Sequence, residues 1–222
     1  MSQAYLKKIK GRYLTAKFRF FKKVWDKKVK ILDVGCGSKS PSLTKNVFTN
    51  CIYHGIDRHL YHNTEHDIAC ANKFFEANLD ENPDMPFLED QLYDVIIFSH
   101  VIEHLVHGDR VLAVACKHLA EDGVIYVEYP GPKSLSLPSM KGTMNFSDDP
   151  THVRLFDIKE VANIMLSNNV TVVKGGTRRF WPSYILLIPR LFKIVFCRVS
   201  PAGALWDMYG MAEYVLGIKK QK

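Results

Sequence analysis

The sequence predicts an α/β protein built on a doubly wound, parallel sheet, and two observations lead to that prediction. Short apolar runs of strand length alternate along the chain with stretches of helical periodicity, an order typical of repeated strand–helix–strand units. The run YDVIIFS at 93–99 is apolar almost throughout, as expected for a strand that helices cover on both faces. The 222 residues are enough for one such domain.

Residues 1–28 predict a basic amphipathic helix in front of that domain, which we place at 29–222. Apolar residues recur there at spacings of three, four and seven, from Leu6 to Trp25. Residues 1–30 hold eleven Lys or Arg and one acid, whereas the other 192 residues have a net charge of −3. Such an arm suits anionic lipid, nucleic acid or an acidic partner, and it equally suits a solvated face that only aids solubility.

The sheet and its helices follow in a regular order. Residues 101–120 and 158–169 have helical periodicity. The expected strands are 29–35, 51–57, 73–80, 93–99, the run after the turn at 121–123, 170–179 and 211–220. Because ligands of such sheets bind outside the carboxyl ends of the strands, we expect the site there.

Two segments fall outside this alternation. Residues 131–152 are rich in Pro, Ser and Gly, and we interpret them as a loop over the carboxyl edge of the sheet. Residues 180–206 form an apolar insert that Pro182, Pro189 and Arg190 interrupt, so it is a poor spanning helix. The insert fits an interfacial helix or a cover for a greasy substrate, and it equally fits a helix packed on the sheet or in a homodimer interface.

A glycine-containing turn follows the first strand, in ILDVGCGSKS (31–40). Gly35 and Gly37 allow the backbone to approach a ligand without a Cβ clash, and the next helix start directs N–H groups toward it. The dinucleotide fingerprint is incomplete, because Ser40 stands at the position of its third glycine. Asp57, twenty residues beyond Gly37, ends the second strand, where an acid accepts the ribose hydroxyls of an adenosine.

Asp33, inside the first strand, indicates the charge of the ligand. A pyrophosphate cofactor gains nothing from an extra carboxylate, whereas a cationic cofactor is stabilised by one. S-adenosylmethionine carries a sulfonium and an ammonium group, together with an adenosine for Asp57. The two acids therefore favour this cofactor over NAD, and an aspartate that only caps a turn is the alternative.

Four segments together resemble the class I S-adenosylmethionine-dependent methyltransferases. VKILDVGCGS resembles the first motif of this family and GIDRH the second. YDVIIFSHVIEHL resembles the fourth, in the subgroup with a Glu-His-Leu turn, and MPFLEDQLYDVI resembles the segment before it. The resemblance covers about residues 28–175 and implies a Rossmann-like, seven-stranded, mostly parallel sheet whose last strand, 211–220, is antiparallel.

The resemblance also implies the cofactor-binding residues. Asp33, Gly35 and Gly37 are expected at the methionine end of the cofactor and Asp57 at the ribose. Asn78 departs from the acid that the family often has at the adenine, but its carbonyl oxygen is still an acceptor. The full expected set is Asp33, Gly35, Cys36, Gly37, Asp57, Arg58, Asn78, Leu79, Ser99 and His100.

Two histidines are candidates for catalysis, because a hydroxyl acceptor loses a proton when it is methylated and imidazole suits that role. His152, in DPTHVRLFD, resembles a His-x-x-x-Phe element of relatives, and we predict it as base or substrate contact. His100, at the end of the fourth strand, is the second candidate. We expect Glu103 and His104 to orient the turn rather than react.

No metal is predicted. The histidines His59, His62 and His66 lie near Cys70, but the spacing matches no zinc-ligand pattern. The five cysteines of the chain are scattered, no CxxC pair occurs, and no secretory signal opens the sequence. We therefore expect reduced thiols and a cytoplasmic protein, at the inner face of a membrane if the arm and the insert bind lipid.

The leading hypothesis is O-methylation of a small molecule, a saccharide or lipid-linked acceptor, with S-adenosylhomocysteine as the second product. The alternative is an RNA methyltransferase that uses the basic arm, against which the absence of an Asn/Asp-Pro-Pro-Tyr-type motif counts. A non-catalytic binding module is a third hypothesis, and the retained acids and glycines argue against it. We accordingly expect a small-molecule acceptor rather than nucleic acid as the partner.

Overall fold

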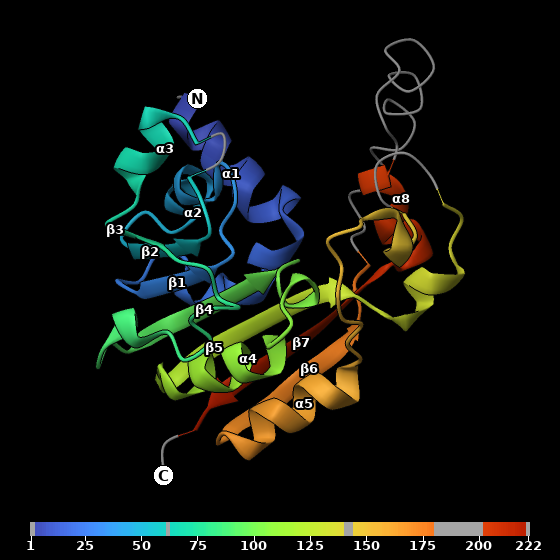
Figure 1. The fold of residues 1–222 in the computed structure, drawn as a ribbon. Coiled ribbons are helices and arrows are strands. Elements are labelled where there is room, and N and C mark those ends of the chain that lie inside the picture. The colour runs from blue at the N-terminus through green and yellow to red at the C-terminus, as the bar shows by residue number, and fades with distance from the viewer. Residues whose placement is uncertain (1–2, 61–62, 140–143, 180–201, 221–222) are drawn as a thin grey trace.

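Seven strands form a single sheet in the order β3-β2-β1-β4-β5-β7-β6 in the computed structural model (Figure 1). The structure describes residues 3–60, 63–139, 144–179 and 202–220. The strands are β1 (Lys30–Val34), β2 (Ile52–Asp57), β3 (Lys73–Glu76), β4 (Tyr93–Ser99), β5 (Leu119–Pro130), β6 (Val170–Thr177) and β7 (Ala212–Lys219).

The pairing confirms the predicted topology. Strands β1 to β5 pair with one another in parallel, and β7 is antiparallel to both β5 and β6. The strand order reverses between β1 and β4, because β2 and β3 extend the sheet on one side of β1 and all later strands on the other. This reversal opens a crevice at the carboxyl ends of β1 and β4, where open α/β sheets bind their ligands.

Alternate residues of each strand pack on opposite faces of the sheet. Leu32 and Ile96 lie in one buried cluster with residues of α4 (Gly108–Lys117) and α5 (Ile158–Ser167). Ile31 and Val95 lie in the cluster on the other face. Helix α2 (Ser40–Val47) packs on that face and also contacts α3 (Glu65–Cys70). Figure 1 shows these two helical layers on either side of the sheet.

The N-terminal arm is not one amphipathic helix, and the prediction for 1–28 is wrong in that respect. It forms α1 (Gln3–Leu14) and then the 3-10 helix η1 (Ala16–Val24), separated by the extended residue Thr15. Phe18 and Phe21 of η1 are buried and pack edge-on against Phe48. The chain breaks at Thr15 because these rings contribute to the core of the sheet rather than to an exposed apolar stripe.

The single helix predicted for 101–120 is also interrupted. A short 3-10 turn, η3 (Ile102–His104), precedes α4, which begins only at Gly108. A Cβ at Gly108 would lie 2.6 Å from the carbonyl oxygen of Ile102, so the chain folds back tightly on η3 at this glycine. The carbonyl of Glu103 accepts the N–H groups of Val153 and Arg154, which ties the turn to the loop after β5.

The predicted loop 131–152 contains two 3-10 turns, η4 (Pro132–Ser136) and η5 (Phe146–Asp148), and another 3-10 turn, η2 (Pro86–Leu88), precedes β4. Residues 180–201 of the predicted insert lie outside the described residues. Its last residues open α8 (Ala202–Tyr209), which lies beyond the carboxyl edge of β5 (Figure 1). Among the residues that the structure describes, none of the helices combines the length and apolar character that crossing a bilayer requires.

Candidate active site

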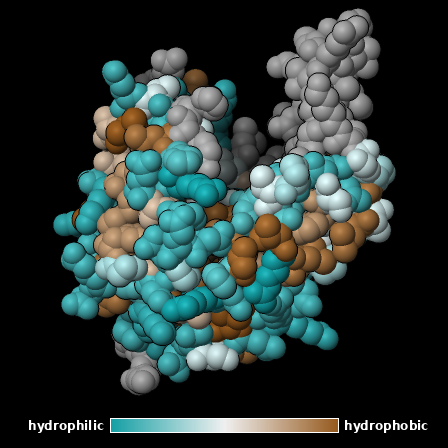
Figure 2. Space-filling view, in the orientation of Figure 1, coloured by the Kyte–Doolittle hydropathy of each residue, from teal (hydrophilic) through white to brown (hydrophobic). Residues whose placement is uncertain are grey.

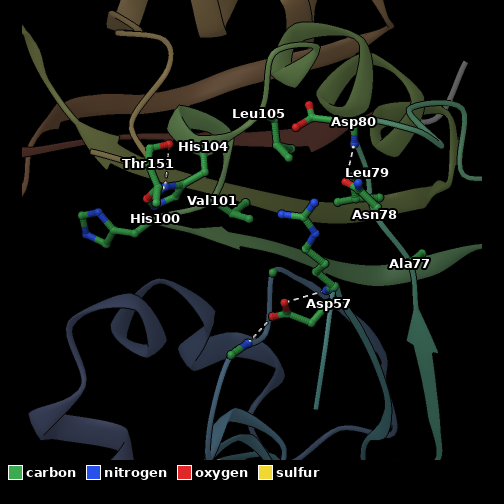
Figure 3. A pocket seen from close by; sticks show the side chains of 13 residues that line it. Asp57, Ala77, Asn78, Leu79, Asp80, His100, Val101, His104, Leu105 and Thr151 are labelled. Carbon is green, nitrogen blue, oxygen red and sulfur yellow. Dashed lines mark hydrogen bonds between the residues drawn. The ribbon is translucent and has the colours of Figure 1, made fainter. Parts of the chain in front are cut away.

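A cavity of about 380 Å³ opens at the carboxyl ends of β1, β2 and β4, where the strand order reverses (Figure 3). This volume falls within the roughly 300–1,000 Å³ of small-molecule sites. The face in Figure 2 is mostly hydrophilic, with hydrophobic residues in separate patches. The residues that line the cavity are Gly35, Gly37, Asp57, Arg58, Ala77, Asn78, Leu79, Asp80, His100, Val101, His104, Leu105 and Thr151.

The turn after β1 depends on its two glycines. Gly35 and Gly37 both have left-handed backbones, with φ of 64° and 59°. A Cβ at Gly35 would collide with the side chain of Val101, whereas one at Gly37 would meet no atom within 4 Å. Gly35 therefore permits close packing of the turn against the segment after β4, and Gly37 leaves its backbone open to the cavity.

Asp57 ends β2 at the floor of the cavity, with its carboxylate between two backbone segments (Figure 3). Its Oδ2 accepts the N–H of Gly37 at 2.7 Å, and its Oδ1 accepts the N–H of Arg58 at 2.7 Å. These bonds fix the carboxylate relative to the glycine turn. A carboxylate has about four lone-pair sites and can accept more than two hydrogen bonds.

Asp33, which we predicted at the methionine end of the cofactor, is not among the residues that line the cavity. Its side chain is 1% exposed. Oδ2 accepts hydrogen bonds from the hydroxyl of Ser40 (2.5 Å) and from that of Tyr53 (2.9 Å), and Nζ of Lys17 lies 4.0 Å away. The carboxylate thus joins β1 to β2, to the start of α2 and to η1. Its position inside the strand turns it into the core rather than toward the crevice.

Two other residues of the predicted set also lie outside the cavity lining, Cys36 and Ser99. The thiol of Cys36 is buried, and burial followed by the charges of Asp33 and Asp57 raises its pKa above the ordinary value. This cysteine is therefore a packing residue rather than a nucleophile.

Asn78 and Leu79 line the cavity as predicted, and Asp80 beside them was missed. Oδ1 of Asn78 accepts the N–H of Asp80, and Nδ2 of Asn78 donates to Glu81. Asp80 in turn accepts the N–H of Val106 at 2.8 Å, which holds the turn after β3 against the segment after η3. The second acid of the cleft is thus Asp80, and its place directly after Asn78 and Leu79 is the sequence signal that could have identified it.

His100 lines the cavity, and its two carboxylate neighbours argue against a role as a general base. Its Nδ1 lies 3.2 Å from Glu103 and its Nε2 lies 3.0 Å from Glu128. Burial alone would lower the pKa of His100, but the hydrogen bonds and charges of these two carboxylates offset that effect and raise the pKa to about 9. The ring is therefore an imidazolium at neutral pH and has no lone pair with which to take a proton.

Glu128 connects His100, through Arg178, to Asp207 of α8. Its carboxylate is buried in β5, pairs with Arg178 at 2.8 Å and accepts a hydrogen bond from the hydroxyl of Tyr126. Burial opposes its charge, but Arg178 and His100 hold its pKa well below the usual range. Arg178 also pairs with Asp207 of α8 at 2.9 Å. A lone acid inside the apolar run VIYVEYP is the sequence signal that could have identified Glu128.

The predicted base, His152, lies behind the cavity wall rather than in it. Its ring contacts that of His104, with 4.7 Å between the ring centroids, and its Nδ1 lies 2.7 Å from the carbonyl oxygen of Phe146. His104 and Thr151 line the cavity instead (Figure 3). We expected His104 only to orient the turn, and the structure places it nearer to the ligand space than His152.

Comparisons with known proteins agree with this architecture. A family model described as a methyltransferase domain matches residues 5–174. No curated protein matches the sequence. Several solved structures are similar, at sequence identities low enough that they show the fold alone.

A S-adenosylmethionine-dependent methyltransferase from Archaeoglobus fulgidus is 16% identical, with a TM-score of 0.59 over 98% of this chain and 100% of that one. One from Mesorhizobium loti is 14% identical, with a TM-score of 0.58 over 92% and 98% of the two chains. Phosphoethanolamine N-methyltransferase 2 from Haemonchus contortus, in complex with S-adenosyl-L-methionine, is 14% identical, with a TM-score of 0.60 over 95% of this chain and 52% of that chain.

Proposed function

Because the chain belongs to the methyltransferase-domain family, as a class I S-adenosylmethionine-dependent methyltransferase, we propose that it methylates a hydroxyl group of a phosphate-bearing acceptor, such as a lipid-linked saccharide. Two features support the proposal: a cavity lined by acids for the cofactor, and a separate groove lined by basic residues. The basic groove is the observation that indicates the acceptor class.

The cleft at the ends of β1 and β2 is the proposed cofactor site. Asp57, whose carboxylate two backbone N–H groups hold at the cavity, accepts the ribose hydroxyls. Leu79 and Ala77 offer apolar contact to the adenine, and the open backbone of Gly37 receives the methionine portion. Asp57 and Asp80 supply negative charge to a cofactor that carries a sulfonium and an ammonium group.

The acceptor hydroxyl is proposed to lie at the end of the cavity that His104 and Thr151 line. The sulfonium is an activated methyl donor, so alignment of the acceptor oxygen with the methyl group supplies much of the acceleration. His104, with His152 packed behind it, provides polar contacts for that oxygen. His100 keeps its charge and orients the segment between β4 and η3 through Glu103 and Glu128.

A groove of about 490 Å³ between η1, β6 and β7 supports an anionic acceptor. Phe20 and Tyr214 both line it, with 4.6 Å between their ring centroids. No acid is among its lining residues, which are Arg19, Phe20, Lys22, Lys174, Thr177, Arg179 and Tyr214. Guanidinium and ammonium groups over aromatic rings suit a phosphate or diphosphate that is attached to an apolar or sugar portion.

The groove and the cofactor cavity are connected through one arginine. Thr177 and Arg179 line the groove, and Arg178 between them pairs with Glu128, which contacts His100 at the cavity. An acceptor that reaches both places is extended, with its phosphate in the groove and its hydroxyl near His104. Lipid-linked saccharides have this form.

The test is transfer of labelled methyl groups from S-adenosylmethionine to a panel of acceptors by the wild type and a charge-reversed variant. The panel contains polyprenyl-diphosphate-linked saccharides, the free saccharides and structured RNA. We expect that only the diphosphate-linked saccharides become labelled. The label should resist treatment with base, because a methyl ether does and a methyl ester does not. We expect Lys22→Glu/Lys174→Glu to raise the acceptor KM by roughly tenfold, since each phosphate contact involves a charged hydrogen bond.

The matched control is Lys28→Glu/Lys117→Glu, which changes the net charge equally at exposed lysines outside the groove. The control should leave the acceptor KM unchanged. Labelling of RNA instead of saccharide, with a steep dependence on salt, would replace this proposal by the RNA alternative. Equal effects of the two double variants would remove the groove from the account.

A further inference from the structure

We propose that Glu103, His104 and His152 bind a divalent metal ion beside the cofactor cavity. One potential ligand atom from each residue lies within 4.8 Å of the other two. The three residues come from η3 and from the loop after β5, so only the folded chain brings them together. Two imidazoles and one carboxylate are a ligand set that divalent transition metals favour, and the set leaves coordination positions open.

The hydrogen bonds of both imidazoles leave Nε2 available as a ligand atom. Nδ1 of His152 lies 2.7 Å from the carbonyl oxygen of Phe146, which can only accept, so Nδ1 carries the proton. Nδ1 of His104 lies 2.8 Å from the hydroxyl oxygen of Thr151. That hydroxyl donates its own proton to Asp149 at 2.6 Å, so it accepts from His104. A ring that donates Nδ1–H to a protein acceptor is the usual arrangement of a metal-binding histidine.

Glu103 supplies the negative charge and a carboxylate oxygen that needs a partner. Its side chain is completely buried, and its Oε1 lies 3.2 Å from Nδ1 of His100. Its Oε2 is also buried and, within the described part of the chain, receives no hydrogen bond. Since a buried unpartnered carboxylate oxygen is costly, a cation at this oxygen explains why the fold retains it.

The surroundings favour a cation at the same place. The imidazole of His100 lies between the carboxylates of Glu103 and Glu128, so one ring faces two acids. Asp149 lies 4.0 Å from Nε2 of His152, too far for a hydrogen bond, and adds negative charge. Metal–ligand bonds of about 2.0–2.2 Å place ligand atoms about 3–4 Å apart, so small side-chain rotations complete the set.

The role of the metal rests on the function proposed above. His104 and Thr151 line the cavity, so an open coordination position of the metal faces the space for the acceptor hydroxyl. A bound hydroxyl has a lowered pKa and releases its proton to the solvent. The oxygen then forms a bond to the methyl carbon while the carbon–sulfur bond breaks, and its electron pair stays on sulfur as a neutral thioether. The protein needs no separate general base in this scheme.

The experiment is a titration of the chelator-treated, dialysed full-length protein with Co²⁺, followed by visible absorption. We expect one Co²⁺ per chain, with bands that indicate nitrogen and oxygen ligands. Glu103→Gln and His152→Ala should each weaken Co²⁺ binding by roughly tenfold or more, because each removes one ligand. Far-UV circular dichroism and thermal melting show whether each variant is folded, and Glu103→Gln keeps the carbonyl acceptor for His100.

The matched control is His66→Ala, because Nε2 of His66 and Sγ of Cys70 lie 3.9 Å apart on α3 and offer a rival chelating pair. This variant should bind Co²⁺ like the wild type. Loss of the bands in His66→Ala alone would place the metal at the rival pair and overturn the proposal. An absence of bands in the wild type would overturn it too, since a water molecule then satisfies Glu103.

The metal proposal and the proposed function fail in different ways. The apoprotein should still bind S-adenosylmethionine, because Asp57 and the glycine turn lie outside the metal ligand set. Methyl transfer should require added divalent ion. Full transfer by the chelated protein would overturn the metal alone, whereas bound metal without transfer to any acceptor hydroxyl would overturn the proposed function.

Discussion

His100 has a left-handed backbone, with φ of 58°, and an imidazole held between two carboxylates. The sequence placed it correctly at the end of β4 but could not give its protonation state, because Glu128 comes from a strand almost thirty residues later. For Asp57 and Asp33, too, the sequence predicted the position but not the surroundings of the side chain. Each ends or lies in the predicted strand, yet only Asp57 faces the cavity, since orientation depends on Ser40 and Tyr53 around Asp33.

His100→Gln tests the charge of this residue through stability. The pKa of His100 is raised from 6.5 to about 9 in the folded protein, so its stabilisation is fully present below about pH 6.5 and is lost as the pH rises through about 9. The difference in free energy of unfolding between wild type and variant should shrink by roughly 1–3 kcal/mol from pH 6 to pH 10. Urea denaturation at each pH measures it, and a difference that stays constant across this range would mean that His100 is neutral.

The N-terminal arm shows what hydrophobic periodicity can and cannot predict. Its apolar residues were identified correctly, and Phe18, Phe21 and Trp25 are indeed on a common side, but that side is buried against the sheet. A periodic pattern does not distinguish a helix that meets lipid from a segment that completes a core. The break at Thr15 and the turn at Gly108 were missed for the same reason, because both are imposed by packing against distant residues.

Phe21→Ala tests the assignment of η1 to the core. Phe21 is 1% exposed and contacts Phe48 and Tyr126. Its loss should lower the free energy of unfolding by about 3–5 kcal/mol, because it removes a buried ring and leaves a cavity. Leu6→Ala, at a position of α1 that is 41% exposed, is the control and should change stability by less than about 0.5 kcal/mol.

Equal stabilities of the two variants, measured by thermal or urea unfolding, would place the arm outside the core. If the prediction holds, deletion of residues 1–24 removes core side chains and is unsuitable as a test of lipid binding. Charge reversal at exposed lysines such as Lys7 and Lys10 then becomes the appropriate change for vesicle flotation.

At the scale of the whole molecule, the sequence predicted the kind of sheet, and the structure adds its strand order. Alternating apolar runs and helical stretches indicated the parallel strands, and the resemblance implied the antiparallel β7. The cleft then lies at the reversal between β1 and β4, with Gly35, Gly37 and Asp57 inside it. The cationic groove and the imidazole pair could not be predicted, because each is assembled from residues of η1, β6 and β7 or of two separate loops.

The central claim is that this cleft binds a cationic nucleoside cofactor through Asp57. Isothermal titration of S-adenosylmethionine and of NAD into wild type, Asp57→Ala and the control Asp90→Ala tests it most directly, since Asp90 is exposed and lies outside the cavity lining. We predict one S-adenosylmethionine per wild-type chain, no binding of NAD, a roughly tenfold or greater loss of affinity in Asp57→Ala and none in Asp90→Ala. Equal affinity of Asp57→Ala and wild type, or heat from NAD and none from S-adenosylmethionine, would contradict the account.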